Sequence, residues 1–524
     1  MPTVTIDGQR LEFAPGQSII EVATKAGIEI PYYCWHAKLS VAANCRMCLV
    51  EVEKAPKLVP SCQTPCADGM VVRTTSEKVK ETQRSVHEFL LLNHPVDCPI
   101  CDQAGECKLQ NYYMTVQLTK SPMREPRLKK HKREELGPYV IYDAERCIMC
   151  TRCVRFMEEV AKERQLGVFQ RGNHAEIGTF PGQPLDHPYS LNVVDLCPVG
   201  ALTSSVFRFK QRVWYLTRSP SICSGCAKGC NIHIDQRSSI VYRLLPRDND
   251  AVNQCWLCDE GRLTYTRAND ARLTEPLMRE AEAVEPLPVK KALPAAAALL
   301  QSAVQAKQPV ALALSLSATC EEAFVVGKLA RELCGATSVA LFGYAEGVAD
   351  ALLKKADKNP NRAGVTAVLG GLGLTVTELA PFLKALNQKQ PAVALVLGHE
   401  LTESEVLAKA MRAHGNVLHV AATRTALAEA ARVSFPSVSF AEADGTWISG
   451  DGRMQRLMPA FAPTSEARPI HTWVAELAQA LGVTWMLGTP ATIRAEMERV
   501  LPAFAAAKIT HVAPQGQPFT PDGA

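Results

Sequence analysis

The sequence lacks several features that would assign the chain to a class at once. No apolar run approaches the ~20 residues that a helix needs to cross a bilayer, so we expect no membrane span. The first residues, MPTVTIDGQRLEF, lack a basic start followed by an apolar core, and we therefore expect no signal or transit peptide. The formal net charge of +4 is too small to indicate nucleic-acid or membrane binding by itself.

Cysteine is scarce in one half of the chain only. After residue 258 the sequence contains only Cys320 and Cys334, whereas the rest of the nineteen cysteines lie between Cys34 and Cys258. Thiols stay reduced in the cytoplasm, so dense cysteines there predict metal or redox chemistry rather than disulfides. A secreted disulfide scaffold would be far shorter than 524 residues. The split predicts two chemistries in one chain, and the length predicts about three or four domains.

The first cysteine group follows a stretch that predicts a small sheet and a helix. Asp-Gly at residues 7–8 is a hairpin signal, and Ser18 can cap a helix that ends at Gly27. This is the layout of a ferredoxin, although residues 35–44 make the first gap wider than in plant-type [2Fe–2S] proteins. A four-cysteine zinc site is the alternative, and Cys66 competes for the last ligand position. The group comprises Cys34, Cys45, Cys48 and Cys62.

The second group combines one histidine with three cysteines, after a predicted helix that begins at the cap residue Ser76. Such a set can bind zinc tetrahedrally. It can equally hold an iron–sulfur cluster, where histidine in place of thiolate removes negative charge and changes the reduction potential. His87, on the predicted helix, is interpreted as an ordinary helix residue. The group comprises His94, Cys98, Cys101 and Cys107.

The third group is the most specific. Three cysteines at C-x2-C-x2-C spacing are typical of a cubane cluster, as in bacterial ferredoxins, whereas zinc sites usually use paired cysteines. The fourth ligand is expected to be a distant cysteine followed by proline, and Pro198 follows one. The group comprises Cys147, Cys150, Cys153 and Cys197.

The fourth group leaves a zinc alternative open. Cys223, Cys226 and Cys230 are followed by Cys255 and Cys258, one of which would complete a [4Fe–4S] site. Two C-x2-C pairs also fit a zinc ribbon that leaves Cys230 spare. The presence of the other three cysteine groups in the same chain favours an iron–sulfur cluster over zinc at this group.

Several stretches together resemble one known family. "NCRMCLVEVE", "NHPVDCPICDQAGECKLQ", "RCIMCTRCVRF" and "DLCPVGAL" are similar to the large iron–sulfur subunit, the G subunit, of bacterial NADH:quinone oxidoreductase, the respiratory complex I. "CSGCAKGCNI" followed by "LCDEGR" is similar to the iron–sulfur segment that opens molybdopterin oxidoreductases and many of these subunits. The resemblance is dense over residues 1–265, where four differently spaced motifs occur in the family's order.

The resemblance implies a ligand set for each cluster, and a role in which no residue of this chain is catalytic. Cys258 is preferred to Cys255 because "CDEGR" fits the family's last ligand, while Cys66 and Cys255 remain unexplained. The implied cofactors are one [2Fe–2S] cluster on Cys34, Cys45, Cys48 and Cys62, and three [4Fe–4S] clusters, on His94, Cys98, Cys101 and Cys107, on Cys147, Cys150, Cys153 and Cys197, and on Cys223, Cys226, Cys230 and Cys258.

The resemblance also implies a function, partners and a location. The chain would be an electron-transfer subunit of an enzyme complex, passing electrons from NADH- and FMN-binding flavoprotein subunits toward quinone-proximal iron–sulfur subunits of the peripheral arm. It would lie peripherally on the cytoplasmic side of the bacterial inner membrane, with no membrane span, no nucleic acid and no substrate site of its own. The alternative is the iron–sulfur or molybdopterin subunit of an NAD-linked formate dehydrogenase or hydrogenase complex. A zinc-stabilised interaction scaffold is a further rival.

The second half begins with a Pro- and Ala-rich linker at residues 266–308 that leads into a helix. Strand-like and helical stretches then alternate, which predicts a parallel sheet with helices on both faces. A helix is expected from the Thr319–Glu322 capping box to Gly335. Another is expected after "GVTAVLGG", capped by Thr375 and Glu378, and a third from Thr402 to Gly415. The incomplete glycine pattern of "GGLGLTV" favours a tight turn over a dinucleotide site.

"SATCEEAFVVGKLAREL" and "DGTWISGDGRMQRL" resemble segments of the molybdopterin-oxidoreductase fold, but the region is short for that fold, and no molybdopterin is expected. The fold class is therefore multidomain α/β and α+β. The predicted domains are a β-grasp [2Fe–2S] ferredoxin domain (1–78), a [4Fe–4S] domain with one histidine ligand (79–118), a [4Fe–4S] ferredoxin-like domain (119–215), a molybdopterin-oxidoreductase-type [4Fe–4S] domain (216–272), a shortened α/β molybdopterin-oxidoreductase-like domain (273–508) and a tail (509–524). Within the tail, residues 513–524, "APQGQPFTPDGA", are expected to be disordered.

Overall fold

The structure is a computed structural model that describes residues 1–116, 121–398 and 404–521. The predicted boundary between residues 118 and 119 and the predicted cap residue Thr402 lie outside the described residues. The chain divides into two compact units, Met1–Leu216 and Thr217–Ala524, and each is described by itself. The division falls next to the predicted domain boundary at residues 215–216.

The first unit contains short strands and helices separated by long loops. Three short 3₁₀ turns also occur in it, η1 (Cys98–Ile100), η2 (Ala144–Arg146) and η3 (Val213–Tyr215). Its strands and helices are, in chain order, β1 (Thr3–Ile6), β2 (Gln9–Glu12), α1 (Ile19–Lys25), β3 (Leu49–Val52), β4 (Val59–Pro60), β5 (Met70–Arg73), α2 (Glu77–Leu91), α3 (Lys108–Val116), β6 (Glu134–Glu135), β7 (Val140–Tyr142), α4 (Arg152–Glu159), β8 (Leu166–Phe169), β9 (Glu176–Thr179), α5 (Asn192–Leu196) and β10 (Leu202–Ser204).

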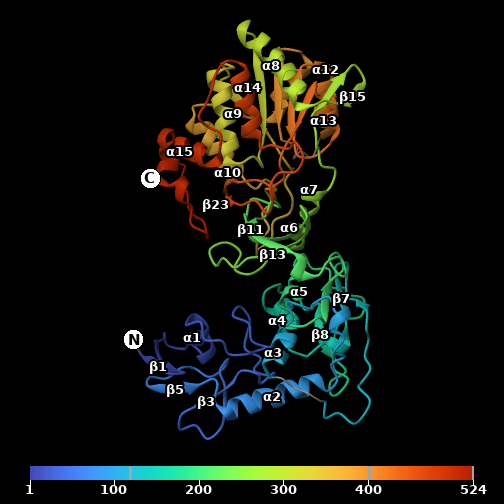
Figure 1. Cartoon of the computed structure of the whole chain (residues 1–524), viewed down its shortest axis with the longest axis vertical. Helices are drawn as coiled ribbons and strands as arrows, with labels where there is room; N and C mark the ends of the chain where they lie inside the picture. Colours follow the sequence, from blue (N-terminus) through green and yellow to red (C-terminus); the bar gives the residue numbers. More distant parts are fainter. Residues whose placement is uncertain (117–120, 399–403, 522–524) are drawn as a thin grey trace. The chain divides into compact units, whose positions relative to one another are not determined.

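The N-terminal part of this unit is a five-stranded sheet in the order β2-β1-β5-β3-β4, with α1 packed on it (Figure 1). The β1–β5 pair is parallel and the other pairs are antiparallel. The predicted hairpin is confirmed: Asp7 and Gly8 both have positive φ, at 45° and 83°, as a two-residue turn of this type requires. The predicted helix is confirmed too, because the Ser18 backbone N–H donates to the Glu21 carboxylate at 2.8 Å at its start.

The rest of the unit is built from smaller pieces. The predicted helix α2 begins at Ser76, whose hydroxyl accepts from the Val79 backbone N–H at 3.4 Å. Beyond it, a three-stranded sheet in the order β10-β7-β6 and a β8–β9 hairpin surround the short helices α4 and α5. Such short elements bury little apolar surface of their own, so this region depends on packing around its cysteine groups.

The second unit is larger and more regular. Its 3₁₀ turn is η4 (Ile509–His511). Its strands and helices are, in chain order, β11 (Thr217–Ile222), β12 (Asn231–Arg237), β13 (Ile240–Pro246), α6 (Asp259–Leu263), α7 (Thr266–Asn269), β14 (Leu277–Glu280), β15 (Ala283–Pro286), α8 (Val289–Gln305), β16 (Val310–Ser315), α9 (Cys320–Glu332), β17 (Ser338–Phe342), α10 (Arg362–Gly371), β18 (Thr375–Thr377), α11 (Leu379–Asn387), β19 (Val393–Leu397), α12 (Ser404–His414), β20 (Val417–Ala421), α13 (Ala426–Ala430), β21 (Val433–Pro436), β22 (Gly445–Ile448), β23 (Arg453–Leu457), α14 (Ile470–Ala480), α15 (Pro490–Val500), α16 (Pro502–Ala506) and β24 (Gln517–Pro518).

Eight of these strands form one sheet in the order β15-β14-β21-β20-β19-β16-β17-β18. The six strands from β21 to β18 are parallel, as the alternating sequence pattern predicts. Both faces are covered, because Leu312 and Leu314 of β16 pack with α8, α9 and α14, whereas Ala313 packs with α11, α12 and α13. In Figure 1, α9 and α14 accordingly lie on one side of the strands and α12 and α13 on the other.

Three expectations for the second unit were wrong. Residues 364–371, "GVTAVLGG", belong to helix α10 and not to a strand, because Val365, Val368 and Leu369 recur at helical spacing and are buried. Thr375 consequently lies in strand β18 and caps no helix; α11 follows Glu378. The stretch 266–308 is not only a linker, since β14 and β15 form a hairpin that adds an antiparallel edge to the sheet.

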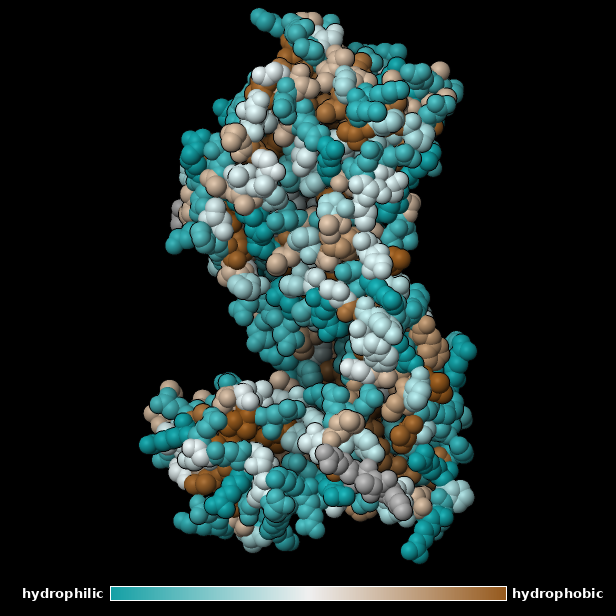
Figure 2. Space-filling view, in the orientation of Figure 1, coloured by the Kyte–Doolittle hydropathy of each residue, from teal (hydrophilic) through white to brown (hydrophobic). Residues whose placement is uncertain are grey.

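The expectation for the tail was also wrong. Residues 513–524 were expected to be disordered, but in their described part, 513–521, β24 pairs with β23, and Phe519 is buried against Phe504 with ring centroids 4.9 Å apart. Among the described residues, no helix is both long and apolar enough to cross a membrane. The face shown in Figure 2 is largely hydrophilic, with apolar side chains in small scattered patches.

Candidate iron–sulfur centres

The first cysteine group lies beside the five-stranded sheet, in the loops before β3 and after β4. Its four thiols form two hydrogen-bonded pairs. The hydrogen bond with Cys45 lowers the pKa of Cys34, and the hydrogen bond with Cys62 similarly lowers the pKa of Cys48. The Cys34 backbone N–H also reaches the Cys45 Sγ at 3.5 Å. The structure therefore brings together all four residues that the sequence singled out here.

Cys66 behaves differently from these four. It packs against the apolar core of the sheet, and its backbone N–H donates to the Gln17 carbonyl at 2.8 Å. Burial first, and then the Glu21 carboxylate, raise the pKa of the Cys66 thiol, with no cysteine among the causes. The pKa of Cys62, by contrast, is raised by its hydrogen bond to Cys48 and by the charges of Cys34 and Cys45. Cys62 thus shares an environment with the other three cysteines, whereas Cys66 does not.

The second group surrounds η1 and the start of α3. Burial, together with the neighbouring thiols Cys101 and Cys98, raises the pKa of Cys107 to about 11. His94 is the fourth predicted member, and burial lowers the pKa of its imidazole to about 4, so the ring is neutral at pH 7. Its Nδ1 atom is buried and has no hydrogen-bond partner among the described residues. A neutral imidazole with an unpartnered buried nitrogen has the form that a metal ligand requires.

Glycine at position 200 connects the second group with the third. A Cβ atom placed on Gly200 would lie 2.2 Å from the Cys101 Sγ, so the sulfur rests directly on the backbone of the "CPVGAL" segment. The Lys108 backbone N–H, next to Cys107, donates to the Pro198 carbonyl at 3.0 Å. These contacts hold two cysteine groups against each other within the first unit.

The third group lines an enclosed cavity of about 20 Å³ together with apolar side chains of β7, β9 and β10. Burial raises the pKa of Cys147, Cys150 and Cys197 to about 11 and that of Cys153 well above its usual value. The Met149 backbone N–H donates to the Cys147 Sγ at 3.4 Å. Met149 and Thr151, which alternate with the cysteines, have left-handed φ angles of 53° and 60°. Such alternation turns successive N–H groups toward a common point, as in anion-binding nests at iron–sulfur sites.

The fourth group lies in the second unit, where β11, β12 and α6 meet. Cys223, Cys226, Cys230 and Cys258 line a cavity of about 10 Å³, whereas Cys255 does not line it. The Gly261 backbone N–H donates to the Cys258 Sγ at 3.2 Å, and a Cβ on Gly261 would lie 2.9 Å from the Cys223 Sγ. The inclusion of Cys230 does not match the zinc-ribbon alternative, which left that residue spare. Across the described residues, no three or more His, Cys, Asp or Glu side chains are arranged to hold a single metal ion.

Cationic residues around these groups were missed in the sequence. Arg146 is buried and its guanidinium contacts Asp97 at 2.7 Å and Asp143 at 3.3 Å. Arg155 of α4 donates to the backbone carbonyls of Cys34 and Cys150, and Arg152 donates to those of Trp35 and Leu196, which are next to cysteines of the first and third groups. Their signal in the sequence is "RCIMCTRCVRF", in which three arginines alternate with the cysteines.

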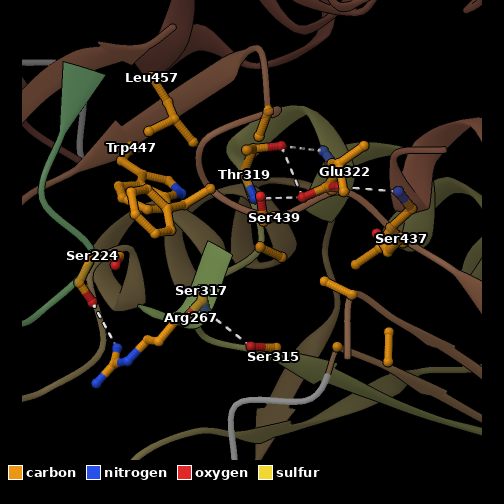
Figure 3. A pocket seen from close by; sticks show the side chains of 18 of the residues that line it. Ser224, Arg267, Ser315, Ser317, Thr319, Glu322, Ser437, Ser439, Trp447 and Leu457 are labelled. Carbon is orange, nitrogen blue, oxygen red and sulfur yellow. Dashed lines mark hydrogen bonds between the residues drawn. The ribbon is translucent and has the colours of Figure 1, made fainter. Parts of the chain in front are cut away.

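A separate pocket lies at the carboxyl ends of the parallel strands of the second unit, the edge where open α/β sheets bind ligands (Figure 3). Its volume is about 70 Å³, and Ser315, Ser437 and Trp447 are among its lining residues. Glu322 accepts from the backbone N–H groups of Thr319, at 2.8 Å, and Ile470, at 3.0 Å. Burial raises the pKa of Glu322 to about 7. The carboxylate thus serves the capping box of α9, which confirms the predicted helix start.

Four family models match consecutive segments of the chain. Residues 1–77 match a 2Fe-2S iron-sulfur cluster binding domain, and residues 83–122 match the NADH-ubiquinone oxidoreductase-G iron-sulfur binding region. Residues 137–203 match the ferredoxin-like domain of NADH-quinone oxidoreductase subunit 3, and residues 217–266 match the NDSU1/NuoG-like 4Fe-4S domain. Together with the gathered cysteines, these matches define the class: the chain is an iron–sulfur protein of 2Fe-2S and 4Fe-4S domains.

The curated relatives are subunits of one kind of enzyme complex. The G subunit of NADH-quinone oxidoreductase from Rickettsia bellii is 44% identical over 280 residues, which are 53% of this chain and 41% of the relative. The mitochondrial 78 kDa subunit of NADH-ubiquinone oxidoreductase from Candida albicans is 45% identical over 283 residues, 54% of this chain and 39% of the relative. The G subunit from Streptomyces coelicolor is 36% identical over 435 residues, 80% of this chain and 50% of the relative. Over these matched segments the chain is similar to the G subunit of NADH-quinone oxidoreductase.

The chain spans about half the length, or less, of the curated relatives it matches. Among solved structures, an NAD+-reducing [NiFe]-hydrogenase in the H2-reduced state is 29% identical, with a TM-score of 0.37, over 40% of this chain and 91% of that chain.

Proposed function

We propose that this chain relays electrons as the iron–sulfur subunit of NADH-quinone oxidoreductase, receiving them from flavin-containing NADH dehydrogenase subunits and passing them toward quinone. The observation that carries the proposal is the gathering of four cysteine groups within segments that match four iron–sulfur family models in order. A bound cluster would supply reversible one-electron chemistry at each group. The chain itself would contribute no catalytic residue and no substrate site.

The proposed ligands are the sixteen residues of the four predicted sets. The thiol pairing of Cys34 with Cys45 and of Cys48 with Cys62 supports the [2Fe–2S] set. The unpartnered Nδ1 of His94 supports histidine ligation of a [4Fe–4S] cluster. The two small cavities support the remaining sets, with Cys258 rather than Cys255 as the last ligand.

The protein's own groups would set the properties of each site. Backbone N–H groups of Met149, Gly225 and Gly261 donate to ligand sulfurs, and such hydrogen bonds raise reduction potentials by stabilising negative charge. Burial excludes water and strengthens each of these interactions. Burial raises the pKa of the ligand thiols, so they are protonated at pH 7 when no cluster is bound. They would bind a cluster as thiolates, so loading would release protons, and the free energy of binding would stabilise the folded chain.

The finer fold assignments belong to the same proposal. The five-stranded sheet with its helix, in the order β2-β1-β5-β3-β4, supports a β-grasp ferredoxin domain. The parallel sheet of the second unit supports a shortened domain of the molybdopterin-oxidoreductase type. The region is short for that fold, and we propose no molybdopterin in it.

The proposed partners are the other peripheral-arm subunits, including the flavoprotein and the quinone-proximal iron–sulfur subunits, on the cytoplasmic side of a bacterial inner membrane. This assignment rests on the family, whose named members are subunits of NADH-quinone oxidoreductase. We propose neither nucleic-acid binding nor a membrane span for this chain.

The test is the content of iron, acid-labile sulfide and zinc in anaerobically purified full-length protein. The proposal predicts about fourteen iron atoms per chain with matching sulfide and little zinc. About ten iron atoms would remove one [4Fe–4S] assignment, and single-site Cys-to-Ser variants would identify the empty group. Stoichiometric zinc without sulfide would refute electron relay and favour the zinc-stabilised scaffold.

A further inference from the structure

The unusually wide gap between the first two cysteines of the first group has a structural use. Residues 35–44 fill this gap, and several of their backbone groups contact helix α4 and the loop before it. The Ser40 backbone N–H donates to the Glu159 carboxylate at 2.8 Å, and the Asn44 side-chain amide donates to the Met149 carbonyl at 3.3 Å. The gap that separates this group from plant-type ferredoxins therefore forms a contact with the third group.

Two guanidinium groups of α4 span this contact. The Nη2 atom of Arg155 donates to the carbonyl of Cys34 at 2.5 Å and to that of Cys150 at 3.2 Å. Its Nη1 atom donates to the carbonyl of Ser40. Arg155 thus joins a residue of the first cysteine group to a residue of the third through one side chain.

Arg152 makes a parallel connection one turn earlier. Its Nη2 atom donates to the carbonyl of Trp35 at 2.5 Å, and its Nη1 atom donates to the carbonyl of Leu196 at 3.1 Å. Trp35 follows Cys34, and Leu196 precedes Cys197. The Arg152 side chain is buried, with 4% of its surface exposed. Both arginines therefore bind backbone beside one cysteine of each group.

Arginine suits this position for a physical reason. Its guanidinium stays charged at every relevant pH and presents several donors in a rigid fork, so one side chain can hold two carbonyls at a fixed spacing. A fixed positive charge in a partly buried site also favours the more negative, reduced state of any nearby redox centre. The same residue can therefore fix the geometry between two centres and raise both potentials.

We propose that Arg155, supported by Arg152, is the positioning residue of a junction between the first and third cysteine groups, and that residues 35–44 form the other side of this junction. Clusters held at the two groups would supply one-electron transfer between them, and Arg155 would fix the backbone beside Cys34 and Cys150 without forming or breaking a bond. The inference rests on the proposed function, since it needs clusters at both groups.

The test compares Arg155→Gln, Arg155→Lys and the control Arg164→Gln in the cluster-loaded full-length chain. Arg164 is 76% exposed and pairs with Glu158, so the control removes the same charge without touching either cysteine group. Redox titration followed by electron paramagnetic resonance gives the potentials of both clusters, and hydrogen exchange reports the protection of the amides of residues 39–45. Iron content shows whether the clusters are retained.

Arg155→Gln is expected to lower the potentials of both clusters and to reduce amide protection about tenfold, as for the loss of a charged hydrogen bond. Arg155→Lys should keep most of the potential, because the charge remains, but should still lose protection, because the fork is gone. Arg164→Gln should match the unmodified chain. If Arg155→Gln loses iron, the test is the comparison of Arg155→Lys with the unmodified chain.

Three results for Arg155→Gln would refute the junction. The first is that its amide protection and both reduction potentials equal those of the control. The second is reduced amide protection with both potentials unchanged, and the third is a change in the potential of one cluster only. The second would mean that Arg155 is only a structural clamp. Absence of both cluster signals in the unmodified chain would instead refute the proposed function, and the exchange data would still show whether Arg155 holds residues 35–44.

Discussion

The substitution Gly200→Ala tests the packing between the second and third cysteine groups. The added methyl group would lie 2.2 Å from the Cys101 Sγ and 3.1 Å from the Gln103 Cβ, so the sulfur must move by more than about 1 Å to reach an ordinary contact distance. The φ angle of Gly200 is outside the left-handed region, so the backbone itself accepts alanine. The effect of the change is therefore steric and local.

Overpacking of this kind costs about 1–3 kcal/mol, which is less than the ~5–15 kcal/mol by which domains are stable. We therefore expect Gly200→Ala to fold but to lose the cluster of the second group, with about four fewer iron atoms per chain. The third cluster should remain, although Cys197 is only three residues away, because no atom of the third group is among the close contacts.

The assay is iron content together with low-temperature electron paramagnetic resonance of the reduced protein, with denaturant unfolding to measure stability. Gly370→Ala is the matched control, since a Cβ there meets nothing within 4 Å and its φ is not left-handed. Retention of every cluster and unchanged stability in Gly200→Ala would refute the packing argument. Loss of the third cluster instead of the second would show that the added methyl group disturbs the segment that contains Cys197 and not the position of Cys101.

Two further predictions address single residues. Cys62→Ser should abolish the [2Fe–2S] signal while Cys66→Ser keeps it, because only Cys62 interacts with the other three thiols; the opposite result in the same spectra would exchange the two ligands. The pKa of Glu322 is raised from 4.5 to about 7 in the folded chain, so its ionisation opposes folding by up to about 3 kcal/mol above pH 7 and not at all below about pH 4.5. Stability of the second unit should therefore fall between these pH values, and Glu322→Gln should remove that slope in pH-dependent denaturation; an unchanged slope would assign it to another group.

The elements that the sequence predicted correctly are those with local signals. The Asp7–Gly8 turn, the Ser76 cap and the Thr319 capping box each depend on residues within three or four positions of one another, and all three are present. Helix α10 was misjudged because Val365 and Val368 favour strands by propensity, whereas the burial of residues one turn apart decides for a helix. Tertiary packing therefore outweighs local propensity in this segment.

The cysteine groups were predictable for the same reason, but their surroundings were not. C-x2-C-x2-C is a spacing within one loop, and it identifies the third group without any knowledge of the fold. The contacts of Arg155 with Cys34 and of Arg152 with Trp35 join residues more than a hundred positions apart. Gly200 meets Cys101 across a similar separation. No periodicity or spacing encodes such pairs, so the arrangement of the groups relative to one another needed the structure.

The backbone of the third group supports the proposal that cluster loading and folding are linked. Met149 and Thr151 hold left-handed conformations that cost non-glycine residues roughly 1–3 kcal/mol each, and the four buried thiols around them gain little from one another. The hydrogen bond from the Met149 N–H to the Cys147 Sγ, at 3.4 Å, offsets only part of that strain. A bound cluster would place more negative charge at this sulfur and strengthen the hydrogen bond, and ligation would offset the cost of both the strain and the buried thiols. The conformation of residues 147–153 is therefore the strongest sign in the backbone itself that the third group is built around a cluster and not around its own side chains.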